Sequence, residues 1–126
     1  MFHKYQRSTI LKKSSENISL KAAGLVMKCG VQPSLIGYTF LAEASVLYAF
    51  EKTSVSNIYR KIAEKYGIQP RSVMRNISYA LSQGFDVHKK LSRIMGVEIP
   101  NNQIHNSLVI AYIAFKLKTD DNKDRD

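Results

Sequence analysis

Arginine and hydroxyl side chains recur on one side of a helix that is predicted to begin at Pro70 in this 126-residue chain. Residues 70–82 read PRSVMRNISYALS, and Val73 and Ile77 mark the side of that helix that would be buried. The side facing away carries Arg71, Ser72, Met74, Arg75, Ser78 and Tyr79. A guanidinium group can bind guanine O6 and N7, hydroxyl groups suit phosphates or base edges, and a methionine can contact a thymine methyl. These residue types predict a surface that reads DNA bases.

Each of these residues also has a plainer interpretation. The two arginines could belong to an ordinary solvated helix face. Tyr79 could pack partly into the core, because tyrosine has a large apolar ring.

A second helix is predicted directly before Pro70, and three residues suit a sharp turn between the two helices. Ala63 is small where the helices would cross, and Gly67 can take the left-handed conformation that ends a helix. Val73 would pack from the second helix against the first. This spacing predicts a helix-turn-helix over about residues 55–84, the arrangement that places one helix in the major groove of DNA. A simple antiparallel helix pair with a glycine turn is the alternative.

Positive charge is concentrated around the same segment. Residues 51–93 carry nine lysines and arginines against three acidic residues, within a chain of net charge +9. Such a concentration favours phosphate neutralisation and counterion release over a merely soluble surface. The residues predicted to contact DNA phosphates are Arg60, Lys61, Lys65, Gln69, Lys89 and Lys90.

The apolar pattern is helical throughout, without the alternation of β-strands. We therefore expect an all-α, compact six-helix domain that contains the helix-turn-helix. The predicted helices run from Glu16 to Lys28, from Pro33 to about Glu51, from the cluster Thr53–Ser56 to Gly67, from Pro70 to near Gly84, from about Val87 to Met95, and from just after Pro100 to about Lys118. Phe85 and Phe115 are expected to point into the core.

Three parts of the chain are expected. Residues 1–15 form a basic arm, predicted to be flexible, with four lysines and arginines and no acidic residue before position 14. Residues 16–118 form the helical domain. Residues 119–126 read TDDNKDRD, have nothing apolar to bury, and are expected to be a disordered tail.

The sequence gives no support for catalysis, so we expect no enzyme activity, no metal and no cofactor. The three histidines His3, His88 and His105 are widely spaced, and no G-x-S-x-G motif, phosphate-binding glycine loop or metal-ligand spacing occurs. The one cysteine, Cys29, lies among apolar residues and is expected to be a buried, inert thiol. The longest apolar run has eight residues and no secretory signal is present, so we expect no membrane association and a cytoplasmic protein.

Several separated motifs resemble one family. They are Gly30-Val31, Gly37-Tyr38, Ile58-Tyr59, Ile62-Ala63, Val73 with Arg75 and Ile77, and Asn106-Ser107 with Ile110-Ala111. In order and spacing, residues 18–118 resemble the C-terminal DNA-binding effector domain of the sporulation stage-zero response regulator, the sporulation initiation master transcription factor of endospore-forming bacteria. The resemblance implies a six-helix domain whose fourth helix recognises a short promoter box, often in tandem copies.

Arg75 falls on a DNA-contacting arginine of that family. The neighbouring residues depart from it: Ser72, Met74 and Ser78 stand where the family has arginine, glutamate and arginine, and Tyr79 stands where it has histidine. These departures leave the target sequence open. The acidic cluster of a phosphoacceptor receiver domain is also missing, so we expect a free-standing effector domain, with a piece of a longer protein as the alternative.

The predicted function is that of a sequence-specific, double-stranded DNA-binding transcriptional regulator. Its expected partner is a promoter site, and the further candidates are RNA polymerase and a second copy of the chain, as a homodimer or as tandem monomers on DNA. The alternative is a protein-interaction module that binds a full-length regulator or RNA polymerase without reading DNA.

Overall fold

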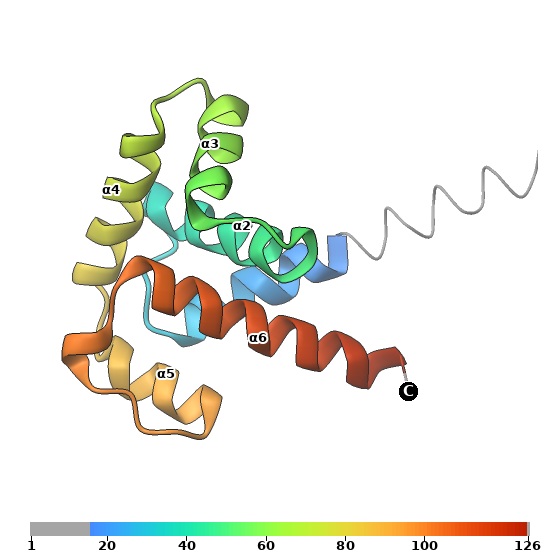
Figure 1. Cartoon of the computed structure of the whole chain (residues 1–126). Coiled ribbons are helices and arrows are strands. Elements are labelled where there is room, and N and C mark those ends of the chain that lie inside the picture. The colour runs from blue at the N-terminus through green and yellow to red at the C-terminus, as the bar shows by residue number, and fades with distance from the viewer. Residues whose placement is uncertain (1–15, 126) are drawn as a thin grey trace, which may run out of the picture.

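The computed structural model describes residues 16–125, and within that range every regular element is a helix (Figure 1). The predicted all-α fold is confirmed. The predicted basic arm at residues 1–15 lies outside the described residues. After a first helix over residues 16–28 come α2 (Ile36–Glu51), α3 (Val55–Tyr66), α4 (Pro70–Ser82), α5 (Val87–Met95), the short 3-10 turn η1 (Asn101–Gln103) and α6 (Asn106–Arg125). None of the helices in this range is both long and apolar enough to span a membrane.

Two predicted helices have different bounds in the structure. The second helix begins at Ile36 instead of Pro33, because Leu35 before it is still extended, with φ −91° and ψ 139°. The last helix begins at Asn106, after the separate turn η1, instead of directly after Pro100.

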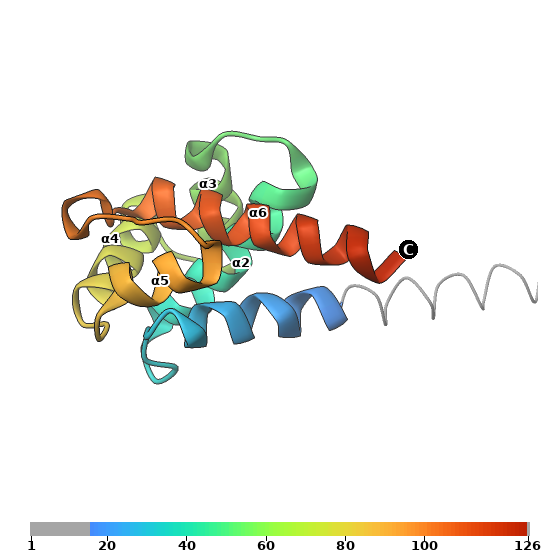
Figure 2. The ribbon, with the colours of Figure 1, turned by 90° about the horizontal axis from the view of Figure 1, so that it is seen from below.

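The predicted disordered tail is also corrected, since α6 continues through Arg125. Its later turns are supported from two sides. Lys116 forms an ion pair with Asp120 one turn on, at 3.4 Å. Asp120 also lines a shallow recess with Lys21 and Leu25, and Figure 2 shows α6 running beside the first helix. An acidic and basic sequence with nothing to bury can thus extend a helix whose earlier turns are already packed.

The core is built around α2, which contacts α3, α4 and α6. Its side chains Phe40, Leu41 and Ala44 are buried, as are Ile58 of α3 and Ile110 of α6. The low polar content of α2 accords with this central position.

Two aromatic residues predicted to be inside are on the surface. Phe85 is 72% exposed and Phe115 is 64% exposed. The buried face of α6 is formed by Val109, Ile110, Ile113 and Leu117, so Phe115 points away from it. Phe85 lies in the loop before α5, where its ring lies 4.8 Å from the Lys90 ammonium.

α2 and α4 approach each other closely at Gly37. A Cβ atom at this position would overlap the backbone carbonyl oxygen of Asn76 and would lie 2.7 Å from the Cβ of Ala80. Because the obstacle includes backbone, no side-chain rotation can relieve it. The absence of a side chain at Gly37 therefore sets the distance between the central helix and α4.

We expect Gly37→Ala to lower the free energy of unfolding by about 1–3 kcal/mol, because the added methyl group overpacks a helix crossing. Gly24→Ala in the first helix is the matched control, since a Cβ there meets nothing within 4 Å. That control should be neutral or stabilise by up to about 1 kcal/mol. Urea denaturation of both variants measures the difference, and equal midpoints for the two would contradict the close approach.

Cys29 is buried, as predicted, and burial raises the pKa of its thiol from 9.0 to about 12. The folded chain therefore resists ionisation of this thiol, whereas the unfolded chain ionises it above pH 9. Stability from the neutral thiol is complete below pH 9 and is lost as the pH rises toward 12. We expect the unfolding free energy of the wild type to fall more steeply above pH 9 than that of Cys29→Ala. Parallel pH profiles in denaturation experiments would show that the thiol is not shielded.

Candidate nucleic-acid interface

α3 and α4 are joined by the three residues 67–69, and both ends of α3 are capped. At its start the Ser54 hydroxyl accepts a hydrogen bond from the backbone N–H of Asn57 at 3.2 Å. At its end Gly67 takes the left-handed conformation, with φ 65°, and the Ile68 N–H donates to the Ala63 carbonyl oxygen at 3.0 Å. α4 then begins at Pro70, a favoured first-turn residue. The predicted turn is therefore present, and it lets α4 pack beside both α3 and α2.

α4 presents most of its predicted reading residues to solvent. Val73 and Ile77 are fully buried, as predicted. Five of the six candidates are exposed and Ser72 is half-buried; the exposed ones are Arg71, Met74, Arg75, Ser78 and Tyr79. Tyr79 is 55% exposed, so it is a surface residue of α4 whose remaining area is covered by the domain.

The charged side chains of α4 are all positive. α4 carries Arg71 and Arg75 and no acidic residue, and Glu64 is the one acid in the sequence between positions 54 and 85. Neither arginine forms a salt bridge among those found in the described residues. The two guanidinium groups therefore remain available to an anionic ligand.

The predicted phosphate contacts do not all lie together. Arg60 of α3 lines a recess with Pro70, Arg71 and Met74, so it lies beside the start of α4. Gln69 is exposed at the N-cap of α4, and its side chain makes no capping hydrogen bond. Lys89 and Lys90 lie on α5, where Lys90 is half-buried against Phe85.

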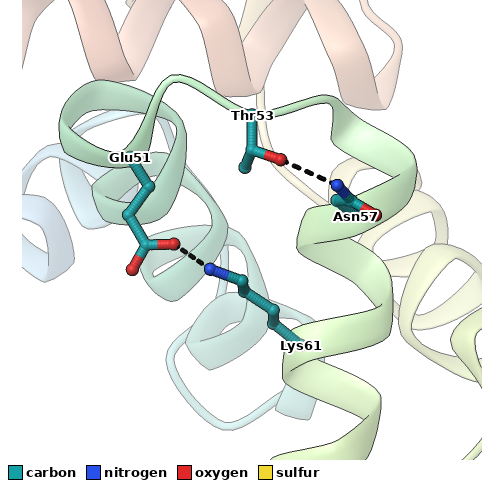
Figure 3. A network of polar contacts seen from close by, with 4 residues as sticks. All are labelled: Glu51, Thr53, Asn57 and Lys61. Atoms are coloured by element: carbon teal, nitrogen blue, oxygen red, sulfur yellow. Dashed lines mark hydrogen bonds and ion pairs between the residues drawn. The ribbon is translucent and has the colours of Figure 1, made fainter.

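Lys61 and Lys65 point to α2 instead. The Lys61 ammonium forms an ion pair with Glu51, beside a hydrogen bond from the Asn57 amide to the Thr53 hydroxyl (Figure 3). Lys65 donates to the Glu43 carboxylate at 2.8 Å, and this hydrogen bond raises the pKa of Lys65. Both lysines therefore neutralise acids of α2, and the structure does not bring them to the surface of α4.

Asn106 belongs to this site, although the sequence did not identify it as a site residue. It is almost fully buried at the first turn of α6. Its amide nitrogen donates to the Met74 carbonyl oxygen at 2.9 Å, and the Ser78 hydroxyl donates to its amide oxygen at 3.1 Å. Burial raises the pKa of the Tyr59 phenol of α3, and the Asn106 side chain has a smaller effect that lowers it. One side chain thus holds α4 against α6.

The sequence contains no local signal for this role, because Asn106 is 28 and 32 residues from its partners in α4. Within residues 16–123 no three histidine, cysteine, aspartate or glutamate side chains are placed to hold a metal ion. What the arrangement offers is a rigid helix with exposed arginines.

Comparison with protein families identifies a relationship for this sequence. The family model described as "Sporulation initiation factor Spo0A C terminal" matches residues 22–117, which include every helix from α2 to α5 and most of α6. No curated protein matches the sequence.

We expect Asn106→Ala to lower the free energy of unfolding by about 1–3 kcal/mol, because it removes the hydrogen bonds of a buried side chain to α4. Ser107→Ala next to it is the control, because that side chain is exposed and should change stability by less than about 0.5 kcal/mol. Denaturant midpoints for the two variants make the comparison. If Asn106→Ala unfolds at the wild-type midpoint, Asn106 does not hold α4.

Proposed function

The chain belongs to the family of the C-terminal domain of the sporulation initiation factor Spo0A, a DNA-binding domain of a transcription regulator, and on that premise we propose that it reads a specific DNA sequence with the outer surface of α4. The supporting observation is the free pair of guanidinium groups on a helix whose opposite side is locked into the core. With 13 residues, α4 is about 20 Å long, and a helix of this kind fits the major groove of B-DNA.

The exposed residues of α4 recognise the bases. Arg75 lies near the middle of the helix, and its guanidinium group can make a bidentate contact with guanine. Arg71, Met74, Ser78 and Tyr79 surround it with one further cation, an apolar tip and two hydroxyl groups, and Ser72 borders them. The family has charged residues at several of these positions, so the preferred promoter sequence of this chain differs from that of its relatives.

Phosphate contacts give most of the affinity and carry little sequence information. Arg60 and Gln69, near the start of α4, together with Lys89 and Lys90 on α5 supply these contacts. Lys61 and Lys65 are left out, because binding a phosphate would break their ion pairs with α2. Because its ligand is DNA, the domain acts in the bacterial cytoplasm. Its further partners are RNA polymerase and a second copy of the chain on a tandem site.

One observation favours a second candidate function. A groove of about 450 Å³ lies between the first helix, α2 and α3, and its floor is mainly apolar, with Ala42, Val46, Leu47 and Ile62. A groove of this kind could receive a helix of a full-length regulator or of RNA polymerase without any contact to DNA. Binding to random double-stranded DNA across a salt titration separates the two functions, since a pure interaction module would not bind even at low salt.

The test of base reading begins with selection of bound duplexes from a random pool. On the selected site, we expect Arg75→Ala to weaken binding by about 1–3 kcal/mol and to relax the preference at one base pair. On random DNA the same variant should lose much less, because phosphate contacts remain.

Lys118→Ala is the matched control, since it removes one exposed positive charge from the half of α6 that lies far from α4 (Figure 1). It should leave the selected base preference unchanged. Equal losses for Arg75→Ala on selected and random DNA would show that Arg75 contacts phosphate only.

A further inference from the structure

The hydroxyl group of Ser78 has a defined hydrogen-bond polarity. Ser78 lies on the exposed surface of α4, and its hydroxyl group donates its proton to the amide oxygen of Asn106 at 3.1 Å. A serine hydroxyl group has one proton and two lone pairs. The oxygen of Ser78 can therefore still accept a hydrogen bond from a ligand, but it has no second proton to donate.

Two contacts of the Met74 carbonyl oxygen fix this polarity. The amide nitrogen of Asn106 donates to it at 2.9 Å, so the amide oxygen of Asn106 is the atom left to face Ser78. The same carbonyl oxygen accepts from the backbone N–H of Ser78, because residues four apart are bonded in an α-helix. Both of its lone pairs are then in use, so the Ser78 hydroxyl group cannot donate to it instead.

Turning the Ser78 proton toward a ligand would bring no net gain. Asn106 is almost fully buried, and its amide oxygen accepts the Ser78 proton. An outward-turned hydroxyl group would leave that oxygen without this donor. The cost of an unsatisfied buried acceptor matches or exceeds the gain from one new hydrogen bond. The proton therefore stays directed at Asn106 when a ligand meets α4.

The groups that DNA presents differ in the same polarity. Phosphate oxygens, guanine O6 and N7, and thymine O4 accept hydrogen bonds, whereas the amino groups on adenine N6 and cytosine N4 donate them. A hydroxyl group that can only accept fits the amino groups. The Arg75 guanidinium group can only donate, so it has the opposite preference.

We propose that Ser78 is a specificity-determining residue that accepts a hydrogen bond from the amino group of adenine or cytosine and does not contact phosphate. Asn106 is its positioning residue, because it holds the Ser78 proton away from the DNA. The inference rests on the proposed DNA-binding function and deepens it. Side chains three residues apart in a helix lie about 5–6 Å apart and base pairs rise by about 3.4 Å, so Ser78 reads a base one or two base pairs from the guanine read by Arg75.

The test compares the duplexes that the full wild-type chain and Ser78→Ala select from a random pool. We expect the wild type to select adenine or cytosine at one position near the guanine read by Arg75, and Ser78→Ala to accept all four bases there. On the selected duplex Ser78→Ala should bind about 3–10-fold more weakly, which corresponds to one hydrogen bond. On random duplexes it should bind like the wild type.

Ser107→Ala is the matched control for the selection. It removes an exposed hydroxyl group from the first turn of α6 instead of from α4. It should leave every base preference unchanged.

Two further measurements separate hydrogen-bond polarity from simple proximity. A selected duplex that lacks only the exocyclic amino group at the Ser78 position should lose as much affinity for the wild type as Ser78→Ala loses, and the two changes together should cause no further loss. Asn106→Ala frees the Ser78 proton, so this variant should also bind guanine or thymine at that position while it keeps the preference at the Arg75 position. A purely structural role of Asn106 would weaken both preferences alike.

Several outcomes would overturn the proposal. They are a wild-type preference for guanine or thymine at the position that Ser78→Ala relaxes, an unchanged preference in Ser78→Ala, equal losses for Ser78→Ala on selected and random duplexes, and additive losses from Ser78→Ala and removal of the amino group. Circular dichroism shows whether Asn106→Ala folds, and Ser78→Ala, an exposed substitution to a strong helix former, tests the proposal independently of it. If the wild type selects no sequence at all, the proposed function itself is wrong, which is a distinct result.

Discussion

The contact between α2 and α4 at Gly37 is the constraint on which the rest of the site depends. With no side chain at Gly37, the backbone of α4 comes close to the central helix, and Val73 and Ile77 become fully buried. On its other side α4 is tied to α6 through Asn106. A helix held in this way cannot rotate about its axis, so the same residues always face solvent. Rigid presentation of a few side chains is what sequence-specific recognition requires.

The lysines and arginines near α4 divide into two groups with different roles. Lys61 and Lys65 neutralise Glu51 and Glu43 and connect α3 to α2. Surface ion pairs of this kind contribute little to stability, but they engage lysine ammonium groups that could otherwise bind phosphate. Arg60, only one residue before Lys61, lies on the α4 side of the same helix. Successive residues of a helix point about 100° apart, so neighbours in the sequence can serve different surfaces.

Local patterns in the sequence were sufficient to predict much of the fold. Ser54, Gly67 and Pro70 mark helix ends by their own backbone and capping preferences, and the structure places the ends of α3 and α4 at these residues. Long-range contacts could not be predicted in this way. The role of Gly37 depends on Asn76, and that of Asn106 on Ser78, and neither pairing leaves a trace in local spacing. The same limit explains the error at Phe115, where the width of the apolar stripe on α6 left its buried side ambiguous.

Whether α4 is the surface that meets DNA is tested by the change in backbone amide NMR signals when a duplex is added to the isotope-labelled chain. We expect the largest changes on α4 around Arg71 and Arg75 and on Arg60. We expect little change around Val46 and Leu47 in the apolar groove. If the changes instead gather on that groove and leave α4 untouched, then α4 is not the surface that meets DNA.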